Sequence, residues 1–180
     1  MVYMLLGTGF EEMEAVVPLD ILRRAGIPVK TVGVNGSTIR GSHDICIEAD
    51  ITLDQLNLTD LEMIIVPGGR DGVAAISNFP DAMAALKFAW GNQKFVAAIC
   101  AGPSVLATLG ITDGKNATCY PGWESKMGSA NMIPDAACIR DGNLITGTSA
   151  GCSLPFGLAL VEALRGSEAA KAVAELMVIR

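Results

Sequence analysis

The sequence has few of the residues on which many cysteine enzymes and metal sites depend. Its 180 residues contain one histidine, His43, and five cysteines, none of which forms a CxxC pair. The odd count and irregular spacing of the cysteines argue against a disulfide framework or a zinc site. With no export signal at the N-terminus, we expect a cytoplasmic protein with reduced thiols, no metal and no other cofactor. The cysteines stand at positions 46, 100, 119, 138 and 152.

Basic residues and long apolar runs are scarce as well. The chain has 13 Lys and Arg against 19 Asp and Glu, a net charge of −6. It therefore lacks the basic face that nucleic-acid backbones require, and no apolar run approaches the roughly 20 residues that span a bilayer. With 51% hydrophobic residues it is typical of a globular protein. We expect a single domain over residues 1–180 that binds neither nucleic acid nor membrane.

Short apolar runs alternate along the chain with segments of helical period. Continuous apolar runs are typical of strands that are covered on both faces. The alternation predicts an α/β fold, a doubly wound and mostly parallel sheet with helices on both faces. The predicted strands are Val2–Leu6, Val29–Val34, Met63–Val66, Phe95–Ile99 and Leu144–Thr146, and the predicted helices are Glu12–Ala25, Pro80–Gly91, Pro103–Leu109, Ser153–Arg165 and a last one to about Met177.

Two stretches interrupt this rhythm. Ser37–Asp54 alternates isoleucine with polar residues, which predicts an edge hairpin or a short antiparallel excursion. Ile111–Asp141 is rich in glycine and proline and is expected to be irregular. Gly26 is predicted to follow the end of the first helix, and Ser153 to cap the start of a later one.

Cys100 is the most informative residue. It follows an apolar strand directly and precedes Ala101-Gly102-Pro103, where a helix is predicted to start. This junction resembles the nucleophile elbow of α/β-hydrolases, with Cys in place of Ser. The positive end of the helix is expected to favour the thiolate. The alternative is a structural cysteine buried at the end of a strand.

A carboxyl group is the expected partner of this thiol. His43 lies in the irregular Ser37–Asp54 stretch, where a surface or interface position is expected, so a Cys-His hydrolase is disfavoured. Glu14 lies one turn inside the first helix and could point toward a neighbouring strand end. Burial there would raise the pKa of its carboxyl group and let it donate a hydrogen bond to a thiolate. The alternative is a solvated glutamate on the helix face.

Two glycine-containing turns also lie at predicted strand ends. Gly7-Thr8-Gly9 resembles the start of a dinucleotide fingerprint, but the third glycine is missing and Glu11 and Glu12 would repel a pyrophosphate. The turn at Pro67–Gly72 either frees backbone N–H groups for an oxyanion pocket or is a plain tight turn.

Three separated motifs together resemble a known family. They are Gly9–Gly26, Val66-Pro67-Gly68-Gly69 and Ala97–Pro103. In this order they are similar to the ThiJ/PfpI superfamily and, within it, to bacterial-type members of the branch of the Parkinsonism-associated deglycase (DJ-one). The resemblance runs from the first strand almost to the C-terminus.

The resemblance implies a flavodoxin-like, class I glutamine amidotransferase-like fold and a homodimer. It assigns Cys100 as the nucleophilic and oxidisable cysteine and Glu14 as its protonated partner, both catalytic. Gly69 and Ala101 would supply backbone N–H groups to the substrate, and Tyr120 would contact it where some relatives have a histidine. The Thr148–Cys152 loop departs from the family pattern and places a further thiol beside the expected pocket.

Three functions remain open from the sequence. The leading one is a glutathione-independent glyoxalase or protein deglycase that acts on a small aldehyde such as methylglyoxal or on an early glycation adduct. The second is an oxidative-stress sensor or protective module that works through oxidation of Cys100. The third, a cysteine hydrolase or amidotransferase relative, is disfavoured because Ala101 follows the cysteine and no histidine follows downstream.

Overall fold

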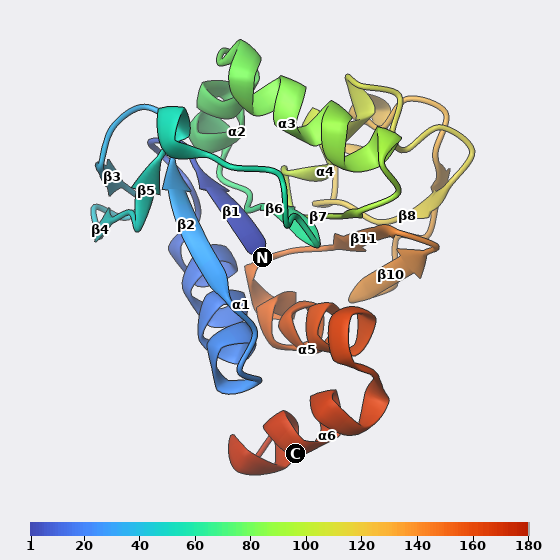
Figure 1. The fold of residues 1–180 in the computed structure, drawn as a ribbon. Helices are drawn as coiled ribbons and strands as arrows, with labels where there is room; N and C mark the ends of the chain where they lie inside the picture. The colour runs from blue at the N-terminus through green and yellow to red at the C-terminus, as the bar shows by residue number, and fades with distance from the viewer. Residues whose placement is uncertain (180) are drawn as a thin grey trace.

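A seven-stranded sheet runs through the centre of the molecule in the computed structural model, which describes residues 1–179 (Figure 1). Its strands lie in the order β10-β11-β7-β6-β1-β2-β5, and all pair in parallel except β10 with β11. The predicted doubly wound, mostly parallel sheet is confirmed. The strands are β1 (Val2–Leu6), β2 (Val29–Gly33), β5 (Ile51–Thr52), β6 (Met63–Val66), β7 (Phe95–Ile99), β10 (Cys138–Asp141) and β11 (Leu144–Gly147).

The three central strands have the predicted bounds and start level with one another. Val2 of β1 pairs with Met63 of β6, and Met63 pairs with Phe95 of β7. All residues of β1 and β6 are buried, as expected for strands with helices on both faces. Because the strands are parallel and in step, the loops that follow them emerge at one edge of the sheet. This edge is where open α/β sheets bind ligands.

Helices cover the two faces of the sheet in separate layers (Figure 1). Alternate residues of β1 point to opposite faces, so Met4 packs in one core cluster and Leu5 in the other. Each such fully buried side chain stabilises the fold by roughly 1.5–3 kcal/mol. One layer holds α1 (Glu12–Arg24), α5 (Ser153–Arg165) and α6 (Ser167–Leu176), and the other holds α2 (Arg70–Ser77), α3 (Pro80–Gly91) and α4 (Pro103–Ala107).

Within residues 1–179, every helix falls short of the length and apolar character needed to cross a membrane.

The segment predicted as a hairpin forms one, but outside the main sheet. Its strands β3 (Thr38–Arg40) and β4 (Cys46–Glu48) pair only with each other, and β5 takes the edge position beside β2. The Gly9 N–H donates to the carbonyl of Arg40 at 2.7 Å, and the Ser42 N–H donates to that of Phe10 at 2.8 Å. These bonds hold the hairpin against the loop between β1 and α1.

Three local predictions are wrong. A helix, α2, begins at Arg70 where only a turn was expected, because Gly69 adopts a positive φ of 89° and lets the chain enter the helix at once. Part of the irregular stretch forms ordered strands, namely β10 and the short parallel pair β8 (Asn116–Ala117) and β9 (Asn131–Met132). Ser153 is the first residue of α5, not its cap, and its hydroxyl donates to the carbonyl of Ala150.

Candidate active site

Cys100 occupies a strained turn between β7 and α4. Its φ of 64° lies in the left-handed region that side chains other than glycine rarely adopt. Two hydrogen bonds hold this conformation: the Cys100 N–H donates to the Gly147 carbonyl at 2.9 Å, and the Tyr120 N–H donates to the Cys100 carbonyl at 2.9 Å. The strained turn places the thiol at the edge of the sheet where the ligand loops meet.

Glu14 points inward from α1 and reaches this thiol. The residue is 1% exposed. The side chain of Glu11 caps the helix by accepting the Glu14 N–H at 3.0 Å, which fixes where the helix starts and which side of it faces the sheet. One carboxylate oxygen of Glu14 accepts the Gly68 N–H at 2.8 Å, and the carboxyl group lies close enough to the Cys100 thiol for each group to shift the pKa of the other. The structure therefore brings together the two residues that the sequence suggested as partners.

Gly68 is the residue that lets Glu14 and Cys100 meet. A Cβ atom at this position would lie 2.7 Å from the Cβ atom of Cys100 and 3.0 Å from the backbone nitrogen of Ala101. Such contacts are far closer than side chains tolerate, so the position admits only glycine without a local shift. The Gly68 N–H is bonded to Glu14, whereas the N–H of its neighbour Gly69 faces the sulfur of Cys100.

The carboxyl and thiol groups titrate as a coupled pair. Burial raises the pKa of Glu14 to about 7, and the hydrogen bonds from Cys100 and Gly68 only partly oppose it. Burial and the charge of an ionised Glu14 raise the pKa of the Cys100 thiol. The positive end of α4 was expected to lower the pKa of this thiol. The net shift is upward instead, because α4 is short and burial has the larger effect on the pKa. The pair as a unit loses its first proton near neutral pH.

The sulfur faces a small cavity of about 190 Å³. The backbone N–H groups of Gly69 and Ala101 donate toward the sulfur, where both residues were expected. Tyr120, which was expected to contact the substrate, also lines the cavity and is 46% exposed. The full lining is Glu11, Gly69, Arg70, Cys100, Ala101, Tyr120 and Trp123.

Arg70 and Trp123 belong to this cavity although sequence reasoning did not single them out. Arg70 is the first residue of the unpredicted helix α2, so recognising the helix from Pro67-Gly68-Gly69 onward would have pointed to it. Trp123 lies in the irregular stretch, where no periodic signal places a side chain. Lys126 stacks on its ring, 3.6 Å from the ring centre.

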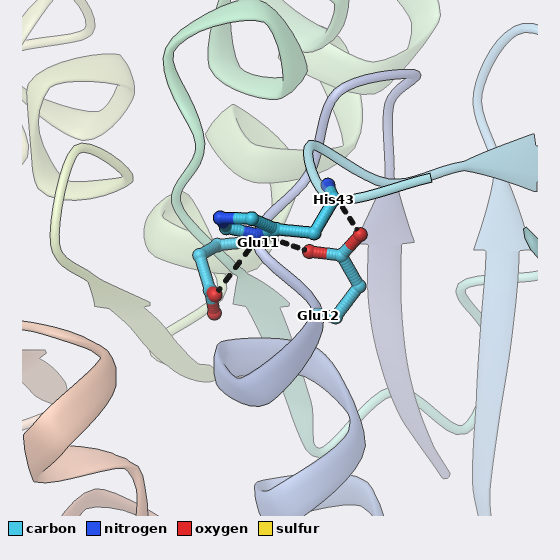
Figure 2. A group of neighbouring side chains, drawn as sticks. All are labelled: Glu11, Glu12 and His43. Atoms are coloured by element: carbon cyan, nitrogen blue, oxygen red, sulfur yellow. Dashed lines mark hydrogen bonds and ion pairs between the residues drawn. The ribbon is translucent and has the colours of Figure 1, made fainter. Parts of the chain in front are cut away.

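Figure 2 shows the only group of three metal-ligating side chains found among residues 1–179, formed by Glu11, Glu12 and His43. Their ligand atoms lie within 4.8 Å of one another, a spacing that a divalent cation could bridge. The Glu12 carboxylate is already occupied: it accepts the His43 N–H at 2.7 Å, the His43 Nδ1 at 3.0 Å and the Ser42 hydroxyl at 3.2 Å. The cluster also lies at the positive end of α1, which disfavours a cation.

The cluster is explained as an ion pair that fastens the β3–β4 loop to α1. Although burial opposes it, the hydrogen bonds from the side chain and backbone of His43 and from the Ile45 N–H lower the pKa of Glu12 to about 2. The hydrogen bond to Glu12 in turn raises the pKa of His43, whose side chain is 71% exposed. The sole histidine thus has its own carboxylate partner and does not line the cavity of Cys100.

The other thiols lie apart from the Cys100–Glu14 pair. Cys119 is buried, and burial raises its pKa to about 11. Burial raises the pKa of Cys138 to about 12, with a further contribution from the neighbouring Cys152. Cys138 and Cys152 therefore lie close enough to interact, and all five cysteines are unpaired.

The chain is similar in sequence to a family of known proteins. The sequence profile of the DJ-1/PfpI family matches residues 1–163. The chain is 36% identical to the Parkinson disease protein 7 homolog of Danio rerio over 180 residues, covering 98% of this chain and 95% of that protein. It is 31% identical over 146 residues to a protein of Pyrococcus horikoshii named a deglycase, covering 81% and 87% of the two chains.

The solved structures agree with the sequence comparison. The crystal structure of Drosophila melanogaster DJ-1beta superposes with a TM-score of 0.95 at 33% identity, covering 99% of this chain and 97% of that one. The predicted flavodoxin-like fold is confirmed by this agreement.

Proposed function

The chain belongs to the DJ-1/PfpI family, and we propose that it is a cysteine-dependent, cofactor-free enzyme that converts 2-oxoaldehydes to 2-hydroxy acids or reverses the early adducts they form on proteins. The observation that carries the proposal is the buried carboxyl group of Glu14 beside the thiol of Cys100, both packed against Gly68. Such a pair supplies a nucleophile and a proton carrier without histidine or metal. A relative named a deglycase supports the second substrate class.

The reactive form of the pair, a thiolate beside a protonated carboxyl group, arises when the proton of Cys100 passes to the ionised Glu14 carboxylate. After the pair loses one proton, the remaining proton lies on oxygen or on sulfur. Sulfur receives the N–H groups of Gly69 and Ala101 and borders the cavity, whereas the carboxylate is 1% exposed and receives only the Gly68 N–H. Burial and the Glu14 charge keep this proton on sulfur at rest, and the N–H groups of Gly69 and Ala101 stabilise the thiolate once the proton moves to Glu14.

Addition to the aldehyde begins the reaction. The Cys100 thiolate forms a bond to the aldehyde carbon, and Glu14 gives its proton to the oxygen to complete a hemithioacetal. While negative charge develops on that oxygen, the N–H groups of Gly69 and Ala101 can shift from sulfur to stabilise it.

Proton transfer between the two substrate carbons completes the chemistry. The Glu14 carboxylate removes the proton of the former aldehyde carbon and returns one to the neighbouring carbon, and the hydroxyl proton of the hemithioacetal passes to the neighbouring carbonyl oxygen. The first carbon is thereby oxidised and the second reduced. The resulting thioester is hydrolysed by water, which releases the 2-hydroxy acid and restores the thiol. No external oxidant or reductant takes part in this sequence.

The test is turnover of methylglyoxal to lactate without glutathione. Cys100→Ser and Glu14→Gln are expected to abolish lactate formation, and Cys46→Ser, which removes an exposed thiol outside the site, is the matched control. Wild-type protein that forms no lactate and removes no early glycation adduct would overturn the proposal. Full activity in Glu14→Gln would refute the role of the carboxyl group.

A second candidate function is sensing or resisting oxidation through Cys100. The same donors that stabilise a thiolate, the N–H groups of Gly69 and Ala101, would hydrogen-bond the oxygens of a sulfinate. Mass spectrometry after mild peroxide treatment is expected to show two added oxygens on Cys100 before any appear on Cys119. A Cys100 that stays reduced while Cys46 oxidises would count against this function.

The partner proposed for the chain is a second copy of itself. Met13 and Val16 lie on one exposed face of α1, and Ile45 is exposed on the hairpin that covers the start of this helix. Exposed apolar side chains grouped in this way are typical of interfaces. We expect a homodimer in light scattering, in a reducing compartment such as the cytoplasm, and a shift toward monomer in Val16→Glu.

A further inference from the structure

Arg70 is an arginine without a partner at the mouth of the Cys100 cavity. It is the first residue of α2, directly after Gly69, and its residue is exposed. No hydrogen bond, ion pair or aromatic contact engages its guanidinium group in the described part of the chain. The five other arginines of residues 1–179 are all engaged: Arg23, Arg24, Arg40 and Arg165 pair with carboxylates, and Arg140 stacks on Phe95.

The acidic residue in the same cavity does not neutralise Arg70, so the guanidinium group is available to bind an anion. The one acidic residue that lines the same cavity is Glu11. One oxygen of Glu11 accepts the Glu14 N–H, and the other lies 3.8 Å from His43 Nδ1 (Figure 2). Glu11 is therefore already compensated by the helix start and by His43, whereas the positive charge of Arg70 is not.

We propose that Arg70 binds the carboxylate of the substrate and makes the site select 2-oxoaldehydes that carry a terminal carboxylate over neutral ones. The planar guanidinium group matches a carboxylate through two parallel hydrogen bonds. A cavity of about 190 Å³ fits a molecule of a few carbon atoms, with the aldehyde at Cys100 and the carboxylate at the rim. The choice of 2-oxoaldehydes depends on the function proposed above, but the binding of a carboxylate does not.

The first experiment tests carboxylate binding without turnover. Iodoacetate and iodoacetamide alkylate Cys100 by the same chemistry and differ in the charge of the group beside the reacting carbon. Arg70→Met is expected to lower the ratio of the iodoacetate rate to the iodoacetamide rate about fivefold. Arg70→Lys should recover part of the ratio, because it keeps the charge and loses the planar geometry.

Lys87→Met is the matched control, since it removes one positive charge from α3. It is expected to change the ratio less than twofold, which separates a local contact from the net charge of the protein. A ratio in Arg70→Met equal to that of wild type would overturn the proposal.

The second experiment tests selection among substrates. For 4,5-dioxopentanoate, a 2-oxoaldehyde with a carboxylate two methylene groups away, the KM is expected to rise about tenfold in Arg70→Met, while kcat changes little. The ratio of kcat/KM for this substrate to that for methylglyoxal should fall accordingly. If wild type turns over neither compound, the proposed function fails, and the alkylation ratios alone still decide whether Arg70 binds a carboxylate.

Discussion

Glu12 and Glu14 lie two residues apart at the start of the same helix, and both are buried, yet their pKa values move in opposite directions. The residues are 5% and 1% exposed. Glu12 has a pKa lowered to about 2, and Glu14 has one raised to about 7. Burial favours the neutral form of both carboxyl groups. Glu12 overcomes it with hydrogen bonds from His43 and Ile45, whereas Glu14 has one backbone donor and a neighbouring thiol.

The difference shows that the balance between burial and hydrogen-bond donors decides which carboxyl group holds a proton: burial prevails at Glu14, and the donors prevail at Glu12. At the start of α1, Glu12 fastens the β3–β4 loop to the helix, and Glu14 is available for proton transfer. A group that titrates near neutral pH suits general acid and base chemistry, and one that is always ionised does not.

The largest effect is expected from Gly68→Ala, which disturbs only the Glu14 side of the comparison. The added methyl group would lie 2.7 Å from the Cβ atom of Cys100 and push the thiol and the carboxyl group apart. A misplacement of about 1 Å costs on the order of 100-fold in rate, so lactate formation should fall by about that factor. Activity within threefold of wild type, in a variant whose circular dichroism is unchanged, would contradict the need for direct contact.

The next largest effect is on the pH dependence of stability. Glu14 has a folded-state pKa of about 7 against 4.5 as its ordinary value, so the folded state holds more protons between these values. Its stabilising contribution is present below pH 4.5 and is lost as the pH rises through 7, roughly 3 kcal/mol in all. Urea unfolding of wild type and Glu14→Gln between pH 4.5 and 7.5 should show this loss only in wild type. Parallel curves for the two proteins would mean that Glu14 ionises normally.

Much of this arrangement could be predicted from the sequence. An apolar strand that runs into Cys100, and a glutamate one turn inside the first helix, place a thiol and a carboxyl group at one edge of a parallel sheet. The contrast between Glu12 and Glu14 could not be predicted, because the donors to Glu12 come from a hairpin about 30 residues away. Arg70 was missed because its helix has only eight residues and contains Gly72, which reads as a turn.

A smaller effect is expected from Glu12→Gln, which tests the role of Glu12 in the comparison with Glu14. The substitution keeps the shape of the side chain but weakens its hydrogen bonds to His43 and Ser42, and bonds to a charged acceptor contribute roughly 1.5–3 kcal/mol. We expect the free energy of unfolding at pH 7 to fall by about 2 kcal/mol, measured by urea denaturation. Lactate formation should fall far less than in Gly68→Ala. Loss of activity without loss of stability would mean that Glu12 acts in the chemistry.

The smallest and most local effect is the titration of His43. As the only histidine, it gives a single imidazole Cε1–H signal that NMR can follow with pH. The hydrogen bond to Glu12 raises its pKa above the ordinary 6.5. The stability it contributes is therefore present below pH 6.5 and is lost as the pH rises through the folded-state value. In Glu12→Gln the titration should return toward 6.5, whereas in Glu14→Gln it should stay raised, because Glu14 does not contact the ring. A titration that moves in both variants would mean that the two carboxyl groups form one network, and the contrast between them would no longer hold.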